Sequence, residues 1–294
     1  MSDPLIRTRL LVGDEAIRRL EEARVAVFGV GGVGGFCVEA LARAGVGALD
    51  LYDDDTVSES NLNRQIVALH STLGQPKAEV MAGRVRDINP ACQVRAIRMF
   101  YLPQNAGQVD LSQYDYVVDC IDTVAAKLEL VTRCTALQVR IISAMGSGNK
   151  LDPTAFQVSD LSRTQGCPLA RVMRKELRRR GIEHLKVVWS PEEPRSPLRP
   201  MEAEVPAGTP PAPSPLSPPP QGWCWPPPSS GSWAAFDRRN RSLLDGFPLS
   251  PLCWDRGECH VYPSEFETAP PGPGDDPGGG GRPAPHHPAG CVQL

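Results

Sequence analysis

The stretch from Val25 to Asp55 constrains the fold of this chain more strongly than any other part. Val25 to Phe28 is a short apolar run typical of a buried parallel strand, and helical periodicity follows from Phe36 to Ala44. Between them lies a GxGxxG turn, which lets the backbone bring bare amides and a helix N-terminus up to phosphate oxygens. Its glycines are Gly29, Gly31, Gly32 and Gly34. The stretch therefore predicts the opening of a nucleotide-binding α/β fold.

A second buried strand is expected at Ala48 to Tyr52, and an acid, Asp53, follows it directly. In folds of this type, a carboxylate at this position meets a ribose hydroxyl. The order of strand, turn, helix, strand and acid argues against a chance GxGxxG match in a glycine-rich loop. It leaves the nucleotide open, because NAD-dependent dehydrogenases share the same fingerprint. A dehydrogenase is therefore one interpretation of this stretch.

Strand-like and helical patterns alternate along the chain as far as Met145. We therefore expect an α/β fold with a Rossmann-like, doubly wound, mostly parallel sheet, followed by a smaller α+β extension. Further helices are expected at Asp14 to Ala23, at Gly74 to about Asn89 with Pro76 in the first turn, at Thr123 to Leu137 and at Pro168 to Arg180, the last with an apolar stripe of Leu169, Val172, Met173 and Leu177. Further strands are expected at Gln93 to Met99, Tyr114 to Ile121, Val139 to Met145, Phe156 to Leu161 and Lys186 to Trp189.

Three charged side chains are expected at the nucleotide end of the sheet. Arg64 lies in the loop after the second strand, Lys77 in the first turn of the next helix, and Asp122 at the end of a central strand. They combine a guanidinium, an ammonium and a carboxylate able to hold magnesium. Displacement of pyrophosphate needs such a clamp on the phosphate oxygens, whereas hydride transfer does not. Taken singly, Arg64 and Lys77 are also typical of solvated surface charges, and Asp122 of a helix N-cap.

Five motifs, GVGGVG, LYDDDTV, SNLNRQ, GQPKAEV and DCID, closely resemble the ubiquitin-activating type of adenylating enzymes, the ThiF/MoeB/HesA-like superfamily. The resemblance implies an ATP site in which Asp53 holds the ribose and Asp122 binds magnesium. It also implies a homodimer in which Arg9 reaches the ATP of the partner subunit. The residues expected to act in catalysis are Arg9, Arg64, Lys77 and Asp122. Those expected around ATP are Gly29, Gly31, Gly32, Gly34, Asp53, Asp55, Asn61, Arg64, Gln65, Lys77 and Asp122.

The sequence from Leu151 to Arg180, followed by KVVWSPEEP, resembles one branch of that superfamily, the tRNA threonylcarbamoyladenosine dehydratases. This resemblance implies that ATP adenylates the threonyl carboxylate of a modified adenosine beside the tRNA anticodon. Cyclisation then expels AMP, so that water is lost overall. The alternative is adenylation of the C-terminus of a ubiquitin-like sulfur carrier, with sulfur-transfer proteins as possible partners. Activators of such carriers usually hold zinc with two CxxC pairs, and this sequence contains no CxxC pair.

The helix expected from Pro168 to Arg180 has two interpretations. Positive charge dominates it, and the resemblance favours a face that contacts tRNA phosphates over an ordinary solvated face. The residues expected at this face are Arg171, Arg174, Lys175, Arg178 and Arg179. Cys167, just before the helix, is either a structural thiol or a nucleophile like the thioester cysteine of carrier activators.

Composition changes near Arg195. The chain has 31 prolines and 27 glycines among 294 residues, and both dominate from Ser196 onward. We expect an ATP-binding adenylating domain at residues 1–150, a tRNA-facing extension of it at 151–195, and a disordered tail at 196–294. The codons of Gln221 to Pro226, read from their third bases, permit AGLVLA, an apolar ending similar to that of the dehydratase branch. The tail is therefore interpreted as a frameshifted reading; a genuine proline-rich tail is the alternative.

Bulk properties exclude little. A net charge of −3 gives no global preference for nucleic acid. The sequence has no apolar run of membrane-spanning length and no signal-peptide pattern, so we expect a cytoplasmic protein. The nine cysteines are scattered and predict no metal site. A degenerate, non-enzymatic nucleotide binder stays open, because the usual apolar ending of the branch is replaced.

Overall fold

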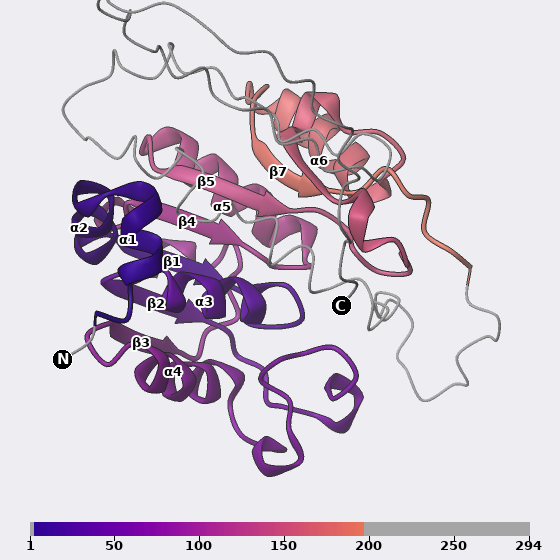
Figure 1. Cartoon of the computed structure of the whole chain (residues 1–294). Helices are drawn as coiled ribbons and strands as arrows, with labels where there is room; N and C mark the ends of the chain where they lie inside the picture. Colours follow the sequence, from indigo (N-terminus) through magenta and orange to yellow (C-terminus); the bar gives the residue numbers. More distant parts are fainter. Residues whose placement is uncertain (1–2, 197–294) are drawn as a thin grey trace, which may run out of the picture. The chain divides into compact units, whose positions relative to one another are not determined.

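The computed structural model of the protein describes residues 3–196. In this part of the chain, seven strands form one sheet in the order β3-β2-β1-β4-β5-β7-β6 (Figure 1). Paired strands are parallel except for β6, which runs antiparallel to β7. The strands are β1 (Arg24–Phe28), β2 (Ala48–Tyr52), β3 (Gln93–Ile97), β4 (Tyr116–Asp119), β5 (Arg140–Ala144), β6 (Gln157–Asp160) and β7 (Lys186–Trp189). This topology confirms the predicted Rossmann-like, mostly parallel sheet.

The helices cover both faces of the sheet. They are α1 (Ile6–Val12), α2 (Asp14–Glu22), α3 (Gly34–Arg43), α4 (Lys77–Ile88), α5 (Val124–Ala136) and α6 (Pro168–Arg179). Apolar residues of α3 and α4 share one core cluster with β1 and β2, whereas α5 shares clusters with β4 on one side and with α6 and β7 on the other. The helices alternate with strands because each crossover between parallel strands must pass over a face of the sheet.

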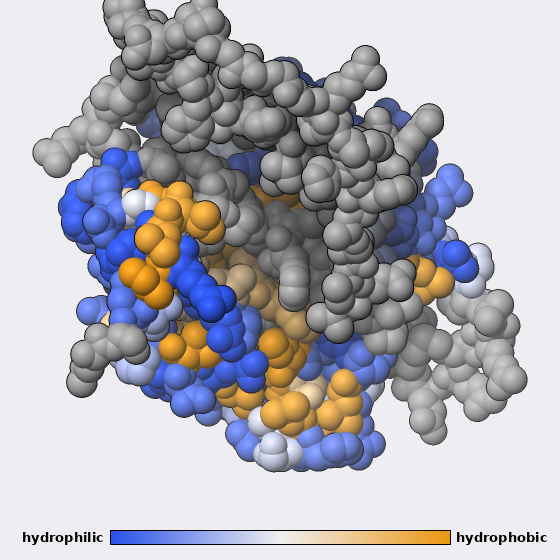
Figure 2. Space-filling view, in the orientation of Figure 1, coloured by the Kyte–Doolittle hydropathy of each residue, from blue (hydrophilic) through white to orange (hydrophobic). Residues whose placement is uncertain are grey.

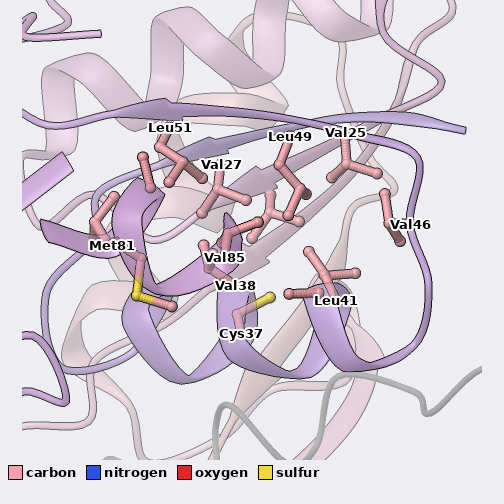
Figure 3. Packing of buried hydrophobic residues seen from close by; sticks show 14 of the residues in the cluster. Val25, Val27, Cys37, Val38, Leu41, Val46, Leu49, Leu51, Met81 and Val85 are labelled. Atoms are coloured by element: carbon pink, nitrogen blue, oxygen red, sulfur yellow. The ribbon is translucent and has the colours of Figure 1, made fainter. Parts of the chain in front are cut away.

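Strand β1 is buried on both faces, which explains its continuous apolar run. Val25 and Val27 lie beside Leu49 and Leu51 of β2 and face α3 and α4 (Figure 3). The intervening Phe28 faces the opposite cluster, where its ring stacks on that of Tyr52 at 4.3 Å between centroids. Side chains alternate along a strand, so an apolar residue at every position indicates helices on both sides.

Four expected strands are shorter than predicted: β5 and β6 by one residue at each end, and β4 and β3 by more. The segment expected as a strand from Tyr114 to Ile121 is a strand only over Tyr116–Asp119. It is shortened before the strand by a 3₁₀ turn at Leu111–Gln113, and after it by a turn in which the Ile121 N–H donates to the Asp119 carboxylate. Strand β3 likewise ends at Ile97 rather than Met99. Apolar residues continue beyond β3 and β4 because they enter the core through loops.

Helix α6 is rotated relative to the predicted apolar stripe. Met173 and Leu177 are buried as expected, but Val172 is 42% exposed and Ala170 is buried in its place. Residues 170, 173 and 177 lie on one side of a helix, whereas position 172 is turned away from them. The expectation that Val172 faces the core was therefore wrong. Both residues are apolar, so hydrophobicity did not distinguish position 170 from position 172. The small Ala170 fits where the helix approaches its neighbours closely.

Helix α1 was not predicted as a helix, and its apolar face is open in this structure. Leu10 and Leu11 are each 78% exposed, and Figure 2 shows apolar residues gathered over α1 and its surroundings. Within residues 3–196 no helix is long and apolar enough to cross a membrane. The predicted tail at 196–294 lies outside the described residues except for Ser196. The division into domains 1–150 and 151–195 stays a prediction, although β6 and β7 extend the same sheet.

Candidate active site

The site is built where the strand order changes direction. Strand β1 lies between β2 and β4, so the loops that follow β1 and β4 leave the same edge of the sheet and diverge. The Gly29 N–H donates to the Tyr52 carbonyl at 2.8 Å, and the Cys120 N–H donates to the Phe28 carbonyl at 2.8 Å. These bonds continue the sheet one residue beyond the strands and place the glycine turn between the two neighbouring loops.

The glycine turn needs glycine at both of its ends. Gly29 has a φ of +86°, and a Cβ there would lie 2.7 Å from the Cys120 carbonyl oxygen. A Cβ on Gly34 would lie 1.8 Å from the Gly29 oxygen. Helix α3 begins at Gly34 with no side-chain cap. The Gly35 N–H donates to the Gly31 carbonyl at 3.0 Å, and the other N–H groups of the first turn can meet an anion, which the helix dipole favours there.

Asp53 lies beside the turn, at the end of β2. Its carboxylate accepts the Val30 N–H at 2.6 Å and the Asp55 N–H at 2.9 Å. Burial raises the pKa of the Asp53 carboxyl, while these backbone donors act in the opposite direction. The carboxylate is therefore held against the glycine turn, where the sequence predicts a ribose contact.

The loop from Asn61 to Gln65 brings a cation and an amide to the same place. Arg64 is half-buried, and it donates to the Ser60 carbonyl at 2.7 Å and to Asn63 Oδ1 at 2.9 Å. Burial lowers the pKa of the Arg64 guanidinium, and no ion pair within residues 3–196 includes it. Gln65 Nε2 lies 3.7 Å from where a Gly31 Cβ would stand, and the buried Gln65 Oε1 has no hydrogen-bond partner in the described chain.

Asn61 has a local role in this structure. It is buried, and its Oδ1 accepts the Ser58 N–H at 3.1 Å in a capping box that shapes the loop. This contact holds the loop that carries Arg64, whether or not Asn61 also meets a phosphate. Its expected contact with ATP stays a prediction.

Lys77 begins α4 and points back to the loop after β2. Its Nζ donates to Asp55 Oδ2 at 2.7 Å, and the lysine side chain is only 6% exposed while that of Asp55 is 65% exposed. The ammonium is therefore fixed from one side by an acid that solvent reaches easily. A phosphate can compete for such an ammonium, because an exposed carboxylate contributes little to an ion pair.

Asp122 follows β4 and is exposed. Its Oδ1 accepts the Thr123 hydroxyl at 3.3 Å, and it forms no ion pair within the described residues. Free carboxylate oxygens fit Mg²⁺, which usually takes one or two carboxylates together with waters and phosphate oxygens. The carboxylates of Asp53, Asp54 and Asp55 also lie within 4.8 Å of one another, but those of Asp53 and Asp55 already have partners. Asp122 therefore suits the metal better than that acidic group.

Arg9 does not join the other residues in this chain. Its guanidinium contacts Asp3 and Asp14, each at 2.7 Å. Leu5, at the start of α1, lies against Gly45, which follows the C-terminal end of α3 and is therefore remote from the glycine turn. Within its own chain Arg9 is thus placed away from the candidate site.

Sequence reasoning missed a buried cluster behind Asp122. Asp119, Lys127 and Ser143 are all fully buried, and the Asp119 carboxylate accepts hydrogen bonds from the other two. The available signal was Lys127, a lysine on the side of α5 that carries its apolar residues.

Cys167 is buried just before α6, with its sulfur 3.7 Å from where a Gly146 Cβ would stand. Nearby, the buried Lys150 donates to the Ser190 carbonyl at 2.6 Å. Burial lowers the pKa of the Lys150 ammonium, although charges on Cys167 and Glu192 act in the opposite direction.

Comparison with known proteins decides the family. Residues 5–188 match the ThiF family, which is more than half of the chain. The chain belongs to the ThiF family. It is 46% identical over 189 residues to the tRNA threonylcarbamoyladenosine dehydratase of Bacillus subtilis, covering 64% of this chain and 74% of the relative. It is 43% identical over 171 residues to the Escherichia coli protein of the same name, covering 58% of this chain and 64% of that relative, just under two thirds.

Solved structures agree with this assignment. A crystal structure of the E. coli tRNA N6-threonylcarbamoyladenosine dehydratase in complex with ATP matches at a TM-score of 0.69 and 33% identity, covering 79% of this chain and 93% of that chain. Adenylating enzymes of sulfur carriers match over shorter stretches. The E. coli molybdopterin-synthase adenylyltransferase is 35% identical over 148 residues. The resemblance to the dehydratase branch is therefore confirmed, and the carrier activators are more distant.

Gly34→Ala tests the glycine turn. The added methyl group would overlap the Gly29 oxygen, so the variant should lose at least about 1 kcal/mol of unfolding free energy and bind ATP at least about tenfold more weakly. The matched control is Gly83→Ala in α4, where a Cβ meets nothing within 4 Å. It should gain about 0.5–1 kcal/mol and bind ATP normally. Urea unfolding and calorimetric titration measure both; equal ATP affinity in the two variants would contradict the assignment of this turn.

Proposed function

We propose that this protein is an ATP-dependent dehydratase of threonylcarbamoyladenosine in tRNA. The observation that carries the proposal is the edge formed by the glycine turn, the unpaired guanidinium of Arg64, the ammonium of Lys77 and the free carboxylate of Asp122. These groups suit the polyphosphate of a nucleoside triphosphate. The names of the related dehydratases indicate the substrate that ATP would activate, threonylcarbamoyladenosine in tRNA. Activation of a sulfur carrier would use the same edge but has less support from the comparisons.

The reaction follows from these groups. An oxygen of the threonyl carboxylate attacks the α-phosphorus of ATP, and the bond to the pyrophosphate oxygen breaks. Negative charge grows on the phosphate oxygens as the bonds exchange, and Arg64 and Lys77 offset it from fixed positions. A nitrogen of the carbamoyl group of the same nucleoside then attacks the activated carbonyl carbon and releases its proton, and AMP leaves with one carboxylate oxygen. The nucleoside thereby loses one water overall and becomes cyclic.

Magnesium is part of this proposal. Asp122 would hold the ion, and a bound Mg²⁺ would neutralise part of the charge on the ATP phosphates. Asp53 would orient the ribose, and the open amides at the start of α3 would receive the phosphates. No covalent enzyme intermediate is required, because the attacking group belongs to the substrate itself. Cys167 therefore needs no role as a nucleophile here.

The decisive experiment measures AMP formation with tRNA that carries threonylcarbamoyladenosine, and the mass of the product nucleoside. The protein should convert ATP to AMP and lower the nucleoside mass by one water. Arg64→Ala and Asp122→Ala should each reduce the rate by at least about a hundredfold, since each removes a charge that acts on the reacting phosphates. Arg18→Ala, which removes an exposed arginine on α2, should leave the rate unchanged.

The result would separate the candidate functions. AMP formation that requires a carrier protein ending in Gly-Gly, and not tRNA, would overturn the dehydratase in favour of the carrier activator. Normal dehydration by Arg64→Ala would contradict the proposed site while leaving the reaction intact. Binding of NAD in preference to ATP would support the dehydrogenase interpretation.

We also propose that one face of α6 contacts tRNA. Arg171, Lys175 and Arg178 are spaced to share one helix face, are exposed, and form no ion pair within residues 3–196. Arg174 instead donates to the Leu161 and Thr164 carbonyls, and Arg179 pairs with Glu176. The three free cations therefore carry the proposal, although the sequence also predicted contacts from Arg174 and Arg179.

Changing Arg171, Lys175 and Arg178 to serine should weaken the binding of tRNA whatever its sequence. It should also reduce the magnitude of the slope of log affinity against log salt concentration by about 2 to 3. ATP binding should not change. The matched control, Arg18→Ser/Arg43→Ser/Arg86→Ser, removes the same charge from α2, α3 and α4. Equal loss of affinity in both triple variants would mean that only net charge matters and that α6 is not the contact face.

A homodimer would explain the position of Arg9. This residue lies away from the site of its own chain, and α1, which carries it, exposes Ile6, Leu10 and Leu11. We infer that α1 packs on a second copy and delivers Arg9 to its ATP.

Mixed Arg9→Ala and Arg64→Ala protomers should then recover up to about a quarter of wild-type activity, because half of the dimers are mixed and one of their two sites is complete. No recovery would mean that Arg9 acts within its own chain, and full activity of Arg9→Ala alone would mean that Arg9 has no role. Sulfur-transfer partners and a cytoplasmic location stay predictions.

A further inference from the structure

Three side chains meet behind the turn that carries Asp122. Asp119 Oδ2 accepts a hydrogen bond from Lys127 Nζ at 2.9 Å and another from the Ser143 hydroxyl at 2.5 Å. Asp119 ends β4, Lys127 lies in the second turn of α5, and Ser143 lies in β5. All three are fully buried. The cluster, which we call the Asp119 anchor, therefore joins two central strands and a helix immediately behind the candidate site.

The second oxygen of Asp119 shapes the turn itself. Asp119 Oδ1 accepts the Ile121 N–H at 3.1 Å, which bends the chain directly before Asp122. The Lys127 N–H donates to the Thr123 carbonyl at 3.1 Å, so the start of α5 is bonded one residue after Asp122. The segment from Asp119 to Lys127 is thus tied at both ends by the same ion pair. Asp122 is the exposed carboxylate in the middle of this closed segment.

The same turn forms a wall of the glycine turn. The Cys120 carbonyl oxygen would lie 2.7 Å from a Cβ on Gly29, so the two backbones are in direct contact. A shift of the turn would therefore move both Asp122 and the space available to the phosphates. The Asp119 anchor is placed to control both at once.

Stability alone does not account for a buried ion pair. Removing both charges from water costs free energy that their attraction only partly restores, and a well-packed apolar pair is often as stable or more stable. The Asp119 anchor also supplies an acceptor for the part-buried Ile121 N–H, and an apolar pair could not do this. The benefit of the ion pair is therefore expected in the geometry of the turn.

We propose that Asp119, Lys127 and Ser143 are positioning residues that hold Asp122 where it receives the metal of the ATP–metal complex. The inference rests on the proposed function through the role given there to Asp122. Asp119 acts through the Ile121 N–H, and Lys127 and Ser143 act by keeping the Asp119 carboxylate in place. None of the three contacts substrate.

Two double variants separate the geometric role from a merely structural one. Asp119→Leu/Lys127→Met removes both charges together and removes the acceptor of the Ile121 N–H. Asp119→Asn/Lys127→Met removes the same charges but keeps an amide oxygen for that N–H and an amide donor for Ser143. Leu130→Ala is the control for lost packing, because Leu130 is fully buried on the same helix and faces a different set of residues.

The readout is ATP affinity by calorimetric titration, with Mg²⁺ and with EDTA, on variants shown to be folded. The factor by which Mg²⁺ tightens ATP binding should fall at least about tenfold in Asp119→Leu/Lys127→Met, because the metal ligand is displaced. It should stay within about threefold of wild type in Asp119→Asn/Lys127→Met and should not change in Leu130→Ala. Ser143→Ala, which removes one hydrogen bond to the Asp119 carboxylate and no charge, should lower this factor about threefold and replaces the first variant if that one does not fold.

The outcomes are distinguishable. A wild-type protein that binds ATP equally with Mg²⁺ and with EDTA would overturn the magnesium role of Asp122 and the inference with it. If Mg²⁺ tightens ATP binding by the same factor in wild type and in folded Asp119→Leu/Lys127→Met, or in Ser143→Ala in its place, the positioning role of the Asp119 anchor is overturned. The proposed function is left intact by that result. A loss of the same size in Leu130→Ala would show that the effect is general loosening of α5.

Discussion

Gly29 packs directly on the backbone carbonyl of Cys120, and the arrangement of the site depends on this contact. It brings the loop after β1 against the loop after β4, at the position where the sheet changes direction. A side chain on Gly29 would push the two loops apart, and a side chain on Gly34 would collide with the Gly29 oxygen inside the turn itself. Phosphate binding and carboxylate placement therefore share one backbone contact, and neither can shift without the other.

Charges around this contact differ in how fully they are paired. Lys127 and Asp119 are paired out of solvent and serve the geometry of the turn, whereas Lys77 pairs with an exposed acid that a phosphate can displace. Arg64 is half-buried with carbonyl and amide acceptors only. A guanidinium that is desolvated but not neutralised gains most from an incoming anion. The charges behind the turn are thus fully paired, whereas Lys77 and Arg64 in front of it are free to pair with an incoming anion. This arrangement suits a site that receives a highly charged ligand.

Local patterns predicted most of the framework. The apolar runs located β1 and β2, and helical periodicity located most of α3, because these features depend on near neighbours in the chain. The ends of β4 were misplaced since a carboxylate–amide bond, rather than a change in hydrophobicity, ends that strand. Val172 was assigned to the core because several rotations of α6 satisfy its pattern equally well. The motifs identified the family, and the comparisons confirmed it.

The sequence by itself determined the parallel sheet, the glycine turn and the membership of the ThiF family, because strand burial, backbone freedom and motif spacing are written in consecutive residues. Only the tertiary structure decided which charges are free. Arg174 and Arg171 look alike in the sequence, yet the first is bonded to the loop at 161–164 and the second is exposed. The Asp119 anchor likewise joins residues from three elements. Pairing and burial depend on which elements meet in space, and a charge pattern along one helix does not contain that information.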